Sequence, residues 1–263
     1  MGSLSPLSHE LVTAAGPVLA VVGAYGTGKT EISVNLALAL AAQPTAPARV
    51  QLADLDLVNP YFRSREAQLP LEAAGVRVVV PPGNQVFADL PIVLPEIAGL
   101  LRPPPGTMTL LDVGGDDVGA RALAAFKPRI GAGTVALWMV INSRRPFSAN
   151  VAEVLAMRQD IEASSRLPVT GLIANSHLVD ETTTDIVLEG WELASEVSNT
   201  TGLPVRAVAV MDALADDAHL ATIDAPLLRL HRHMLPPWSA ADSSQAALLG
   251  EHPDHTIRGE HHG

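Results

Sequence analysis

Residues 23–30 read Gly23-Ala24-Tyr25-Gly26-Thr27-Gly28-Lys29-Thr30, which is the pattern G-x-x-x-x-G-K-[ST] of a phosphate-binding loop. The apolar run 18–22 before it is typical of a buried strand. The Ala- and Leu-rich stretch 31–40 after it is typical of a helix. In this context, backbone N–H groups and a helix N-terminus surround phosphate oxygens. The stretch therefore predicts a nucleotide site, and the alternative is an ordinary glycine-rich turn with a solvated lysine.

Two polar side chains at the end of this phosphate loop (residues 23–30) carry its predicted chemistry. We expect Lys29 to reach the β- and γ-phosphates and the hydroxyl of Thr30 to bind Mg²⁺. Only Lys29 and Lys127 are lysines among the 17 Lys and Arg residues of the chain. A compact ammonium suits this position better than a planar guanidinium. Further contacts to the nucleotide are expected from Gly23, Tyr25, Gly26, Thr27, Gly28 and Glu31.

The bulk composition limits the classes of partner. The chain has 263 residues, a hydrophobic fraction of 48% and a net charge of −11 without any basic run. This balance argues against nucleic acid and anionic membranes as partners, because both need clustered Lys and Arg. The absence of cysteine excludes a disulfide or a thiolate metal site built from this chain. With no signal-peptide pattern at the N-terminus, we expect a cytoplasmic protein.

Apolar strand-like runs alternate with helical stretches along the chain. Strands are predicted at 18–22, 50–53, 75–80, 107–111, 134–141, 169–174 and 204–210. Helices are predicted at 29–42, 116–126, 148–165, 184–201 and 224–234. Nearly continuous apolar runs indicate strands that are buried on both faces. We therefore predict an α/β P-loop NTPase fold in three layers, α/β/α, with a mostly parallel sheet.

The predicted domain organisation has three parts. Residues 1–15 are an N-terminal extension, 16–235 form the nucleotide-binding domain, and 236–263 are a poorly ordered tail. The tail contains His252, His255, His261 and His262. These histidines are either solvated or bind a metal, and the composition favours the first.

Polar side chains follow several of the predicted strands. Asp54, Asp56, Asp112, Asn142 and Asn175 all fall at carboxyl ends, where ligands bind in open parallel sheets. Asp112 is expected to hold Mg²⁺ through water. The alternative for each carboxylate is helix capping or a loop hydrogen bond. Gly115, three residues after Asp112, is expected to turn its N–H toward the γ-phosphate.

The chain resembles the MinD/ParA-type P-loop ATPases, a broad group that includes cobyrinic-acid synthase-like members. The resemblance covers roughly residues 16–235. It rests on the phosphate loop, on Asn35-Leu36-Ala37, on Asp54-Leu55-Asp56, on residues 110–115 and on Asn175. The segments DLDLVNPYFRSRE (54–66) and LLDVGGDDVGAR (110–121) are similar to a bacterial subgroup without an established function. The resemblance implies that Asp56 positions the attacking water and that Asp54 supports Mg²⁺ from its outer shell.

The base is expected to be adenine. A guanine reader has the pattern Asn-Lys-x-Asp, whereas this chain has Asn175-Ser176-His177-Leu178 and lacks the aspartate. The amide of Asn175 can pair with the adenine edge, and a local turn role for this residue is an equal alternative.

One departure from the family concerns assembly. MinD/ParA proteins carry a signature lysine that reaches the partner's nucleotide, and its position is Ala24 here. Arg63 and Arg65, or Arg144 and Arg145, are candidates to replace its charge, with solvated arginines as the alternative. Tyr61 and Phe62 are either a partner contact or packing on the sheet edge. We expect a homodimer whose facing surface includes residues 59–66.

Three functions remain open from the sequence. The first is a slow Mg-ATPase that acts as a nucleotide-dependent switch or accessory factor for a protein partner. The second is a small-molecule ligase or kinase of the dethiobiotin-synthetase-like type. The third is an adapter that binds nucleotide without hydrolysing it.

Overall fold

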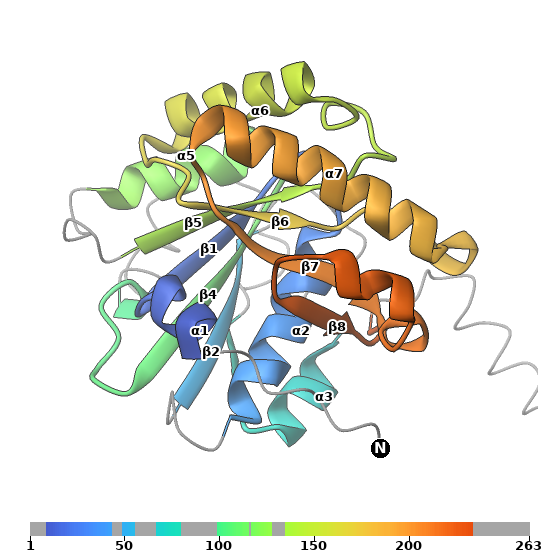
Figure 1. The fold of residues 1–263 in the computed structure, drawn as a ribbon. Helices are drawn as coiled ribbons and strands as arrows, with labels where there is room; N and C mark the ends of the chain where they lie inside the picture. The colour runs from blue at the N-terminus through green and yellow to red at the C-terminus, as the bar shows by residue number, and fades with distance from the viewer. Residues whose placement is uncertain are drawn as a thin grey trace, which may run out of the picture.

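Within the part of the chain that the structure describes, eight strands form one sheet, and every neighbouring pair in it is parallel (Figure 1). The computed structural model describes residues 9–43, 49–55, 67–79, 99–115, 117–127 and 135–233. The strand order is β3-β2-β4-β1-β5-β6-β7-β8. The strands are β1 (Val18–Val22), β2 (Arg49–Leu55), β3 (Arg77–Val79), β4 (Thr107–Val113), β5 (Val135–Ile141), β6 (Gly171–Ala174), β7 (Val205–Met211) and β8 (Leu227–Leu230).

Helices cover both faces of this sheet (Figure 1). They are α1 (His9–Ala15), α2 (Lys29–Ala41), α3 (Gln68–Ala73), α5 (Asp117–Phe126), α6 (Val151–Ser165) and α7 (Thr184–Thr201). Successive residues of β1 point to opposite layers, because side chains alternate along a strand. Leu19 and Val21 join the core cluster of α1, α2 and α3, whereas Ala20 and Val22 join that of α5, α6 and α7.

The predicted fold class is confirmed. The sheet is buried between two helical layers, and the phosphate loop connects its central strand β1 to α2. This is the three-layer α/β/α architecture of a P-loop NTPase. Within the described residues the sheet is wholly parallel, which is more regular than the mostly parallel arrangement predicted.

The helix predicted at 224–234 is wrong. Leu227–Leu230 form β8 at the edge of the described sheet, where burial alternates along the strand and β7 is its paired neighbour. Pro226 precedes β8, and its carbonyl accepts a hydrogen bond from Val208 N. Four residues that alternate in burial fit an edge strand, whereas a helix needs a longer periodic run. Among the described residues, the short helices α1 and α3 were not predicted, and Leu11 of α1 is buried in the core.

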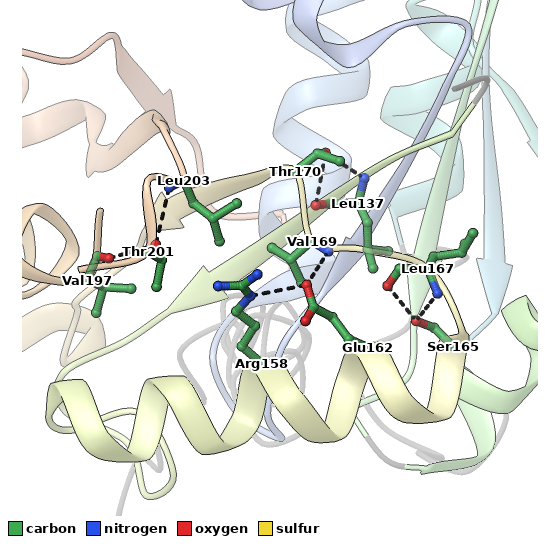
Figure 2. A network of polar contacts seen from close by, with 10 residues as sticks. All are labelled: Leu137, Arg158, Glu162, Ser165, Leu167, Val169, Thr170, Val197, Thr201 and Leu203. Carbon is green, nitrogen blue, oxygen red and sulfur yellow. Dashed lines mark hydrogen bonds and ion pairs between the residues drawn. The ribbon is translucent and has the colours of Figure 1, made fainter. Parts of the chain in front are cut away.

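A polar network fastens α6 to the strands at the amino end of β6 (Figure 2). Glu162 accepts hydrogen bonds from Arg158 Nε at 3.1 Å and from Val169 N at 2.9 Å. The hydroxyl of Thr170 exchanges hydrogen bonds with the backbone N–H and C=O of Leu137 on β5. Ser165 caps the turn by accepting from Leu167 N. We call these residues the α6–β6 network.

No helix within the described part of the chain is long and apolar enough to cross a membrane.

Candidate phosphate-binding site

The phosphate loop has a backbone that only glycine permits at two positions. Gly23 and Gly28 have φ angles of 149° and 90°, in a region that side chains disfavour. A Cβ on Gly23 would lie 2.7 Å from the carbonyl oxygen of Val140 on β5. A Cβ on Gly28 would lie 2.3 Å from Asn175 Nδ2, beyond the end of β6. The loop is therefore held tightly against the carboxyl ends of two neighbouring strands.

The lysine of the loop is not a solvated side chain. Only 7% of Lys29 is exposed, and its Nζ donates a hydrogen bond to the carbonyl oxygen of Ala24 at 2.9 Å. The hydroxyl of Thr27, which is fully buried, donates to the same carbonyl at 2.9 Å. Lys29 thus folds back over the loop, with its ammonium held beside the residues that would surround phosphate oxygens. Lys29 is therefore not solvated, and phosphate binding by it stays a prediction.

Gly115 lies directly against the loop. A Cβ at this position would be 2.7 Å from Lys29 Nζ and 2.8 Å from the backbone nitrogen of Tyr25. The structure therefore brings the segment after β4 to the ammonium of Lys29. Glycine is required there because the approach involves backbone atoms. Whether its N–H binds a γ-phosphate stays a prediction.

Two buried carboxylates lie beside the first turns of α2. The register of β2 and β4 pairs Asp54 with Asp112, so their side chains share the face of the sheet that α2 covers. They are 2% and 0% exposed. The hydroxyl of Ser33 donates to Asp112 Oδ1 at 3.3 Å. Ser33 was missed by the sequence reasoning, although it follows Thr30 by three residues and therefore shares its face of the helix.

The oxygen atoms of Asp112, Asp54 and Thr30 are suited to a Mg²⁺ ion that is bound by the protein and by phosphate together. Among the described residues, no group of three or more His, Asp or Glu side chains could hold a metal by itself. Mg²⁺ commonly takes one or two carboxylates together with phosphate oxygens and water. Asp112, Asp54 and the half-buried Thr30 offer such an incomplete set.

The opposite flank of the loop carries Asn175 and His177. Asn175 Nδ2 donates to the carbonyl oxygen of Thr27 at 2.8 Å, so this amide group braces the loop. A role for Asn175 in reading the base stays a prediction. His177 lies next to it, with Nε2 3.4 Å from where a Cβ on Gly28 would be. Burial, and then the charges of Arg145 and Arg232, lower the pKa of His177 below its ordinary value of 6.5.

Glu31 belongs to a structural contact. Its Oε1 accepts a hydrogen bond from His233 N at 2.7 Å, and Asn35 Nδ2 donates to its backbone carbonyl. Asn35 also exchanges two hydrogen bonds with the backbone of His231. The side chain of Glu31 thus faces the segment after β8, and a nucleotide contact of Glu31 stays a prediction.

Several predicted residues lie outside the part of the chain that the structure describes. They are Asp56, the switch segment 59–66 with Tyr61, Phe62, Arg63 and Arg65, and the tail 236–263. Their predicted roles stay untested.

A cavity of about 310 Å³ adjoins the loop on the side of Gly115. Its walls come from the start of the loop, the segment after β4, and α5 and α6. Met157 of α6 lines it and accepts a hydrogen bond from Ala24 N through its sulfur at 3.2 Å. Tyr25 and Phe147, each 70% exposed, also line it. The cavity is mainly apolar, with the carboxylates of Glu153 and Asp160 on the α6 side.

The chain matches no protein-family model and no curated protein. Among solved structures, the cell division protein FtsY from Thermotoga maritima is 18% identical with a TM-score of 0.49, over 79% of this chain and 63% of that one. The signal recognition particle receptor FtsY from Elizabethkingia anophelis, in complex with GDP, is 16% identical with a TM-score of 0.45, over 80% and 59%. HypB from Helicobacter pylori, in complex with nickel, is 14% identical with a TM-score of 0.36, over 76% and 81%.

The chain spans about three fifths of the length of the FtsY chains that it matches. None of these similarities is strong enough to assign an activity, a ligand or a partner to this chain.

Proposed function

We propose that this protein is a Mg-ATP-binding P-loop ATPase of the MinD/ParA type, which acts as a nucleotide-dependent switch or accessory factor for a partner protein. The observation that carries the proposal is the contact of Lys29 with both ends of the site. Its ammonium bonds to the carbonyl of Ala24 and lies against Gly115. Loss or hydrolysis of a ligand bound beside Lys29 would therefore alter the contacts of the segment that follows Asp112. A switch requires such a coupling between the ligand and a segment of the protein.

The phosphates, the Mg²⁺ ion and the attacking water are each assigned to particular residues in this proposal. Lys29 and the loop N–H groups would hold the phosphates, and Thr30 and Asp112 would hold Mg²⁺, with Asp54 supporting it. The metal, when bound, supplies charge that stabilises the transferring phosphoryl group. Asp56 is proposed to orient the attacking water, and we expect slow turnover.

Adenine is proposed over guanine on the residues that follow β6. The segment Asn175-Ser176-His177-Leu178 has no carboxylate to accept two hydrogen bonds from guanine. Because the amide nitrogen of Asn175 is engaged with Thr27, adenine selectivity would come from the absence of that carboxylate. Competition of ATP and GTP for the purified protein measures this preference directly.

Phosphate release from ATP in the absence of any added substrate tests the activity. We expect slow Mg²⁺-dependent release by the wild-type protein. Lys29→Ala should abolish it through lost binding, and Asp56→Ala should lower turnover while sparing binding. Parental turnover in the Asp56→Ala variant would refute the role of Asp56. A nucleotide that stays intact in the wild-type protein would favour a non-hydrolysing adapter.

The cavity beside Gly115 favours a second candidate function. An acceptor molecule in it would lie next to the residues proposed to hold the γ-phosphate, as an ATP-dependent small-molecule ligase or kinase requires. Such an enzyme would release phosphate or ADP only when its acceptor is supplied. A strict dependence of turnover on a small carboxylate or hydroxyl compound would therefore replace the switch by this alternative.

A homodimer is the proposed assembly, with an unidentified protein as a further partner. The exposed rings of Tyr25 and Phe147 beside the loop support a surface that another protein covers, because aromatic side chains favour interface positions. The proposed facing surface also includes residues 59–66. Light scattering with a non-hydrolysable ATP analogue tests it. A strict monomer, or a dimer indifferent to charge reversal at Arg63 and Arg65, would reject it.

A further inference from the structure

Arg145 lies over the middle of the phosphate loop. The Cδ and Nε atoms of its side chain are both 3.7 Å from where a Cβ on Gly26 would be, and Cζ is 4.0 Å away. Gly26 has a φ of 76° and no side chain of its own to separate the guanidinium from the loop backbone. The positive end of Arg145 therefore lies on the loop at Gly26, close enough to His177 to influence its pKa.

The backbone of Arg145 is held in place by a tight turn after β5. Arg145 N donates to the carbonyl oxygen of Asn142 at 3.0 Å, and Arg144 N donates to Asn142 Oδ1 at 3.0 Å. Asn142 is completely buried, and the hydroxyl of Ser148 donates to its carbonyl oxygen. Ser143 bonds to the hydroxyl of Ser176 through both its backbone N–H and its side chain. The turn is thus fixed to β5 and β6, and the position of Arg145 follows from the sheet.

The charge of Arg145 is not matched by an acid in the described part of the chain. Its neighbour Arg144 pairs with Glu189 on α7, and Arg232 pairs with Asp180. Arg145 has no such ion pair with a described residue, and its buried Nε makes no hydrogen bond there. A partly buried guanidinium without an anion is costly, and a guanidinium binds phosphate oxygens with suitable geometry.

We infer that Arg145 binds the phosphate chain of the nucleotide within its own subunit, as a second cation beside the loop. This inference rests on the proposed nucleotide-binding function. It gives the loop two cations, Lys29 beside Gly115 and Arg145 beside Gly26. The position of Ala24 then needs no lysine for the phosphates to be neutralised.

The low pKa of His177 agrees with this placement. Arg145 is the larger of the two charges that lower it, so the field of the guanidinium reaches the wall of the site at Gly28. The shift is therefore the one expected of a guanidinium that lies as close to the loop as its distances to Gly26 indicate.

The test is calorimetric titration of four proteins with ATP, ADP and adenosine in the presence of Mg²⁺. The proteins are the wild type, Arg145→Gln, Arg145→Lys and the matched control Arg144→Gln, which removes an arginine bound to Glu189. We expect Arg145→Gln to weaken ATP and ADP binding by roughly ten- to a hundredfold, as for a lost charged hydrogen bond. Arg145→Lys should restore part of the affinity, and Arg144→Gln should leave it within about twofold.

Adenosine separates a phosphate contact from stacking on the base. We expect the wild type and Arg145→Gln to bind adenosine with the same affinity. An equal loss of adenosine and ATP affinity in Arg145→Gln would overturn the phosphate contact, as would an ATP affinity within twofold of the wild type. Circular dichroism of each variant shows whether it is folded. If the wild type binds ATP and Arg145→Gln binds it equally, this inference alone fails. If the wild type binds neither ATP nor GTP, the proposed function fails with it.

Discussion

The two ends of the sheet use polar groups in opposite ways. At the amino end of β6, the α6–β6 network pairs each polar side chain with a neighbour from the protein itself (Figure 2). At the carboxyl ends of β1, β4 and β5, glycine backbone, a lysine and an arginine converge without a matching acid for Arg145 among the described residues. The polar groups of the first arrangement satisfy one another, and we propose that a bound anion satisfies those of the second.

This difference separates stability from binding. Groups that satisfy one another contribute to folding, and removing one leaves its partner unpaired. Groups arranged for a ligand cost stability in the free protein and return it on binding. Substitutions at the amino end should therefore change the free energy of unfolding, and those at the carboxyl end should change nucleotide affinity.

Among the substitutions that compare the two ends of the sheet, the largest effect is expected at Asp112, the fully buried carboxylate of β4. Asp112→Asn keeps the shape and the contact with Ser33 but removes the charge that we propose faces Mg²⁺. We expect the gain in ATP affinity on adding Mg²⁺ to fall by about a hundredfold, roughly 2.7 kcal/mol. Titrations with Mg²⁺ and with EDTA measure that gain. Exposed Glu192→Gln is the control for charge, and an unchanged gain in Asp112→Asn would contradict the Mg²⁺ role.

Gly115→Ala should have the next largest effect. Its Cβ would be forced within 2.7 Å of Lys29 Nζ and within 2.8 Å of the backbone of Tyr25, so the loop or the segment after β4 must shift. We expect ATP affinity to fall about tenfold, roughly 1.4 kcal/mol. Gly99→Ala, where a new Cβ meets nothing within 4 Å, is the matched control. Equal affinities for the two variants would mean that Gly115 is not in the site.

At the amino end, Glu162→Ala should change stability alone. It removes the acceptor of Val169 N and the partner of Arg158, and we expect about 1–2 kcal/mol of destabilisation in urea unfolding. The ATP affinity of the folded variant should equal that of the wild type. A loss of affinity without a loss of stability would reverse the comparison between the two ends.

The smallest effect concerns pH. Because the pKa of His177 is lowered in the folded protein, the unfolded chain takes up a proton more readily below pH 6.5. The stability that depends on neutral His177 is present above pH 6.5 and is lost as the pH falls through the lower, folded pKa. His177→Gln should therefore flatten the fall of the urea midpoint between pH 6.5 and 5. His233, whose pKa burial and His231 also lower, should keep part of that slope.

The local parts of this architecture were predictable, and the long-range contacts were not. The loop, β1 and α2 follow from glycine spacing and apolar periodicity within 25 residues of sequence, roughly one strand and one helix. The hydrogen bond from Asn175 to Thr27 joins residues 148 positions apart, and no sequence pattern in either segment predicts it. The sequence favoured Arg63 and Arg65 over Arg145, and only the turn at Asn142 shows that Arg145 lies over Gly26.

The error at β8 has the same cause. Leu227–Leu230 are too few for periodicity to separate a strand from a helix, and only pairing with β7 decides between them. Gly115, in contrast, was singled out from its spacing to Asp112, because Asp112 lies near the end of β4 and Gly115 follows that strand closely. The sequence therefore predicted the elements and candidate residues within each segment better than the contacts between segments.

The most direct test of the account is calorimetric titration of Mg-ATP into the wild-type protein and into Lys29→Ala. Lys29 is buried in the loop and its Nζ donates a hydrogen bond to Ala24, so circular dichroism must accompany the titration to show that the variant is folded. The account predicts saturable binding of one ATP per chain by the wild type and at least a hundredfold weaker binding by Lys29→Ala. Equal ATP affinity in the two proteins would contradict a nucleotide site at residues 23–30.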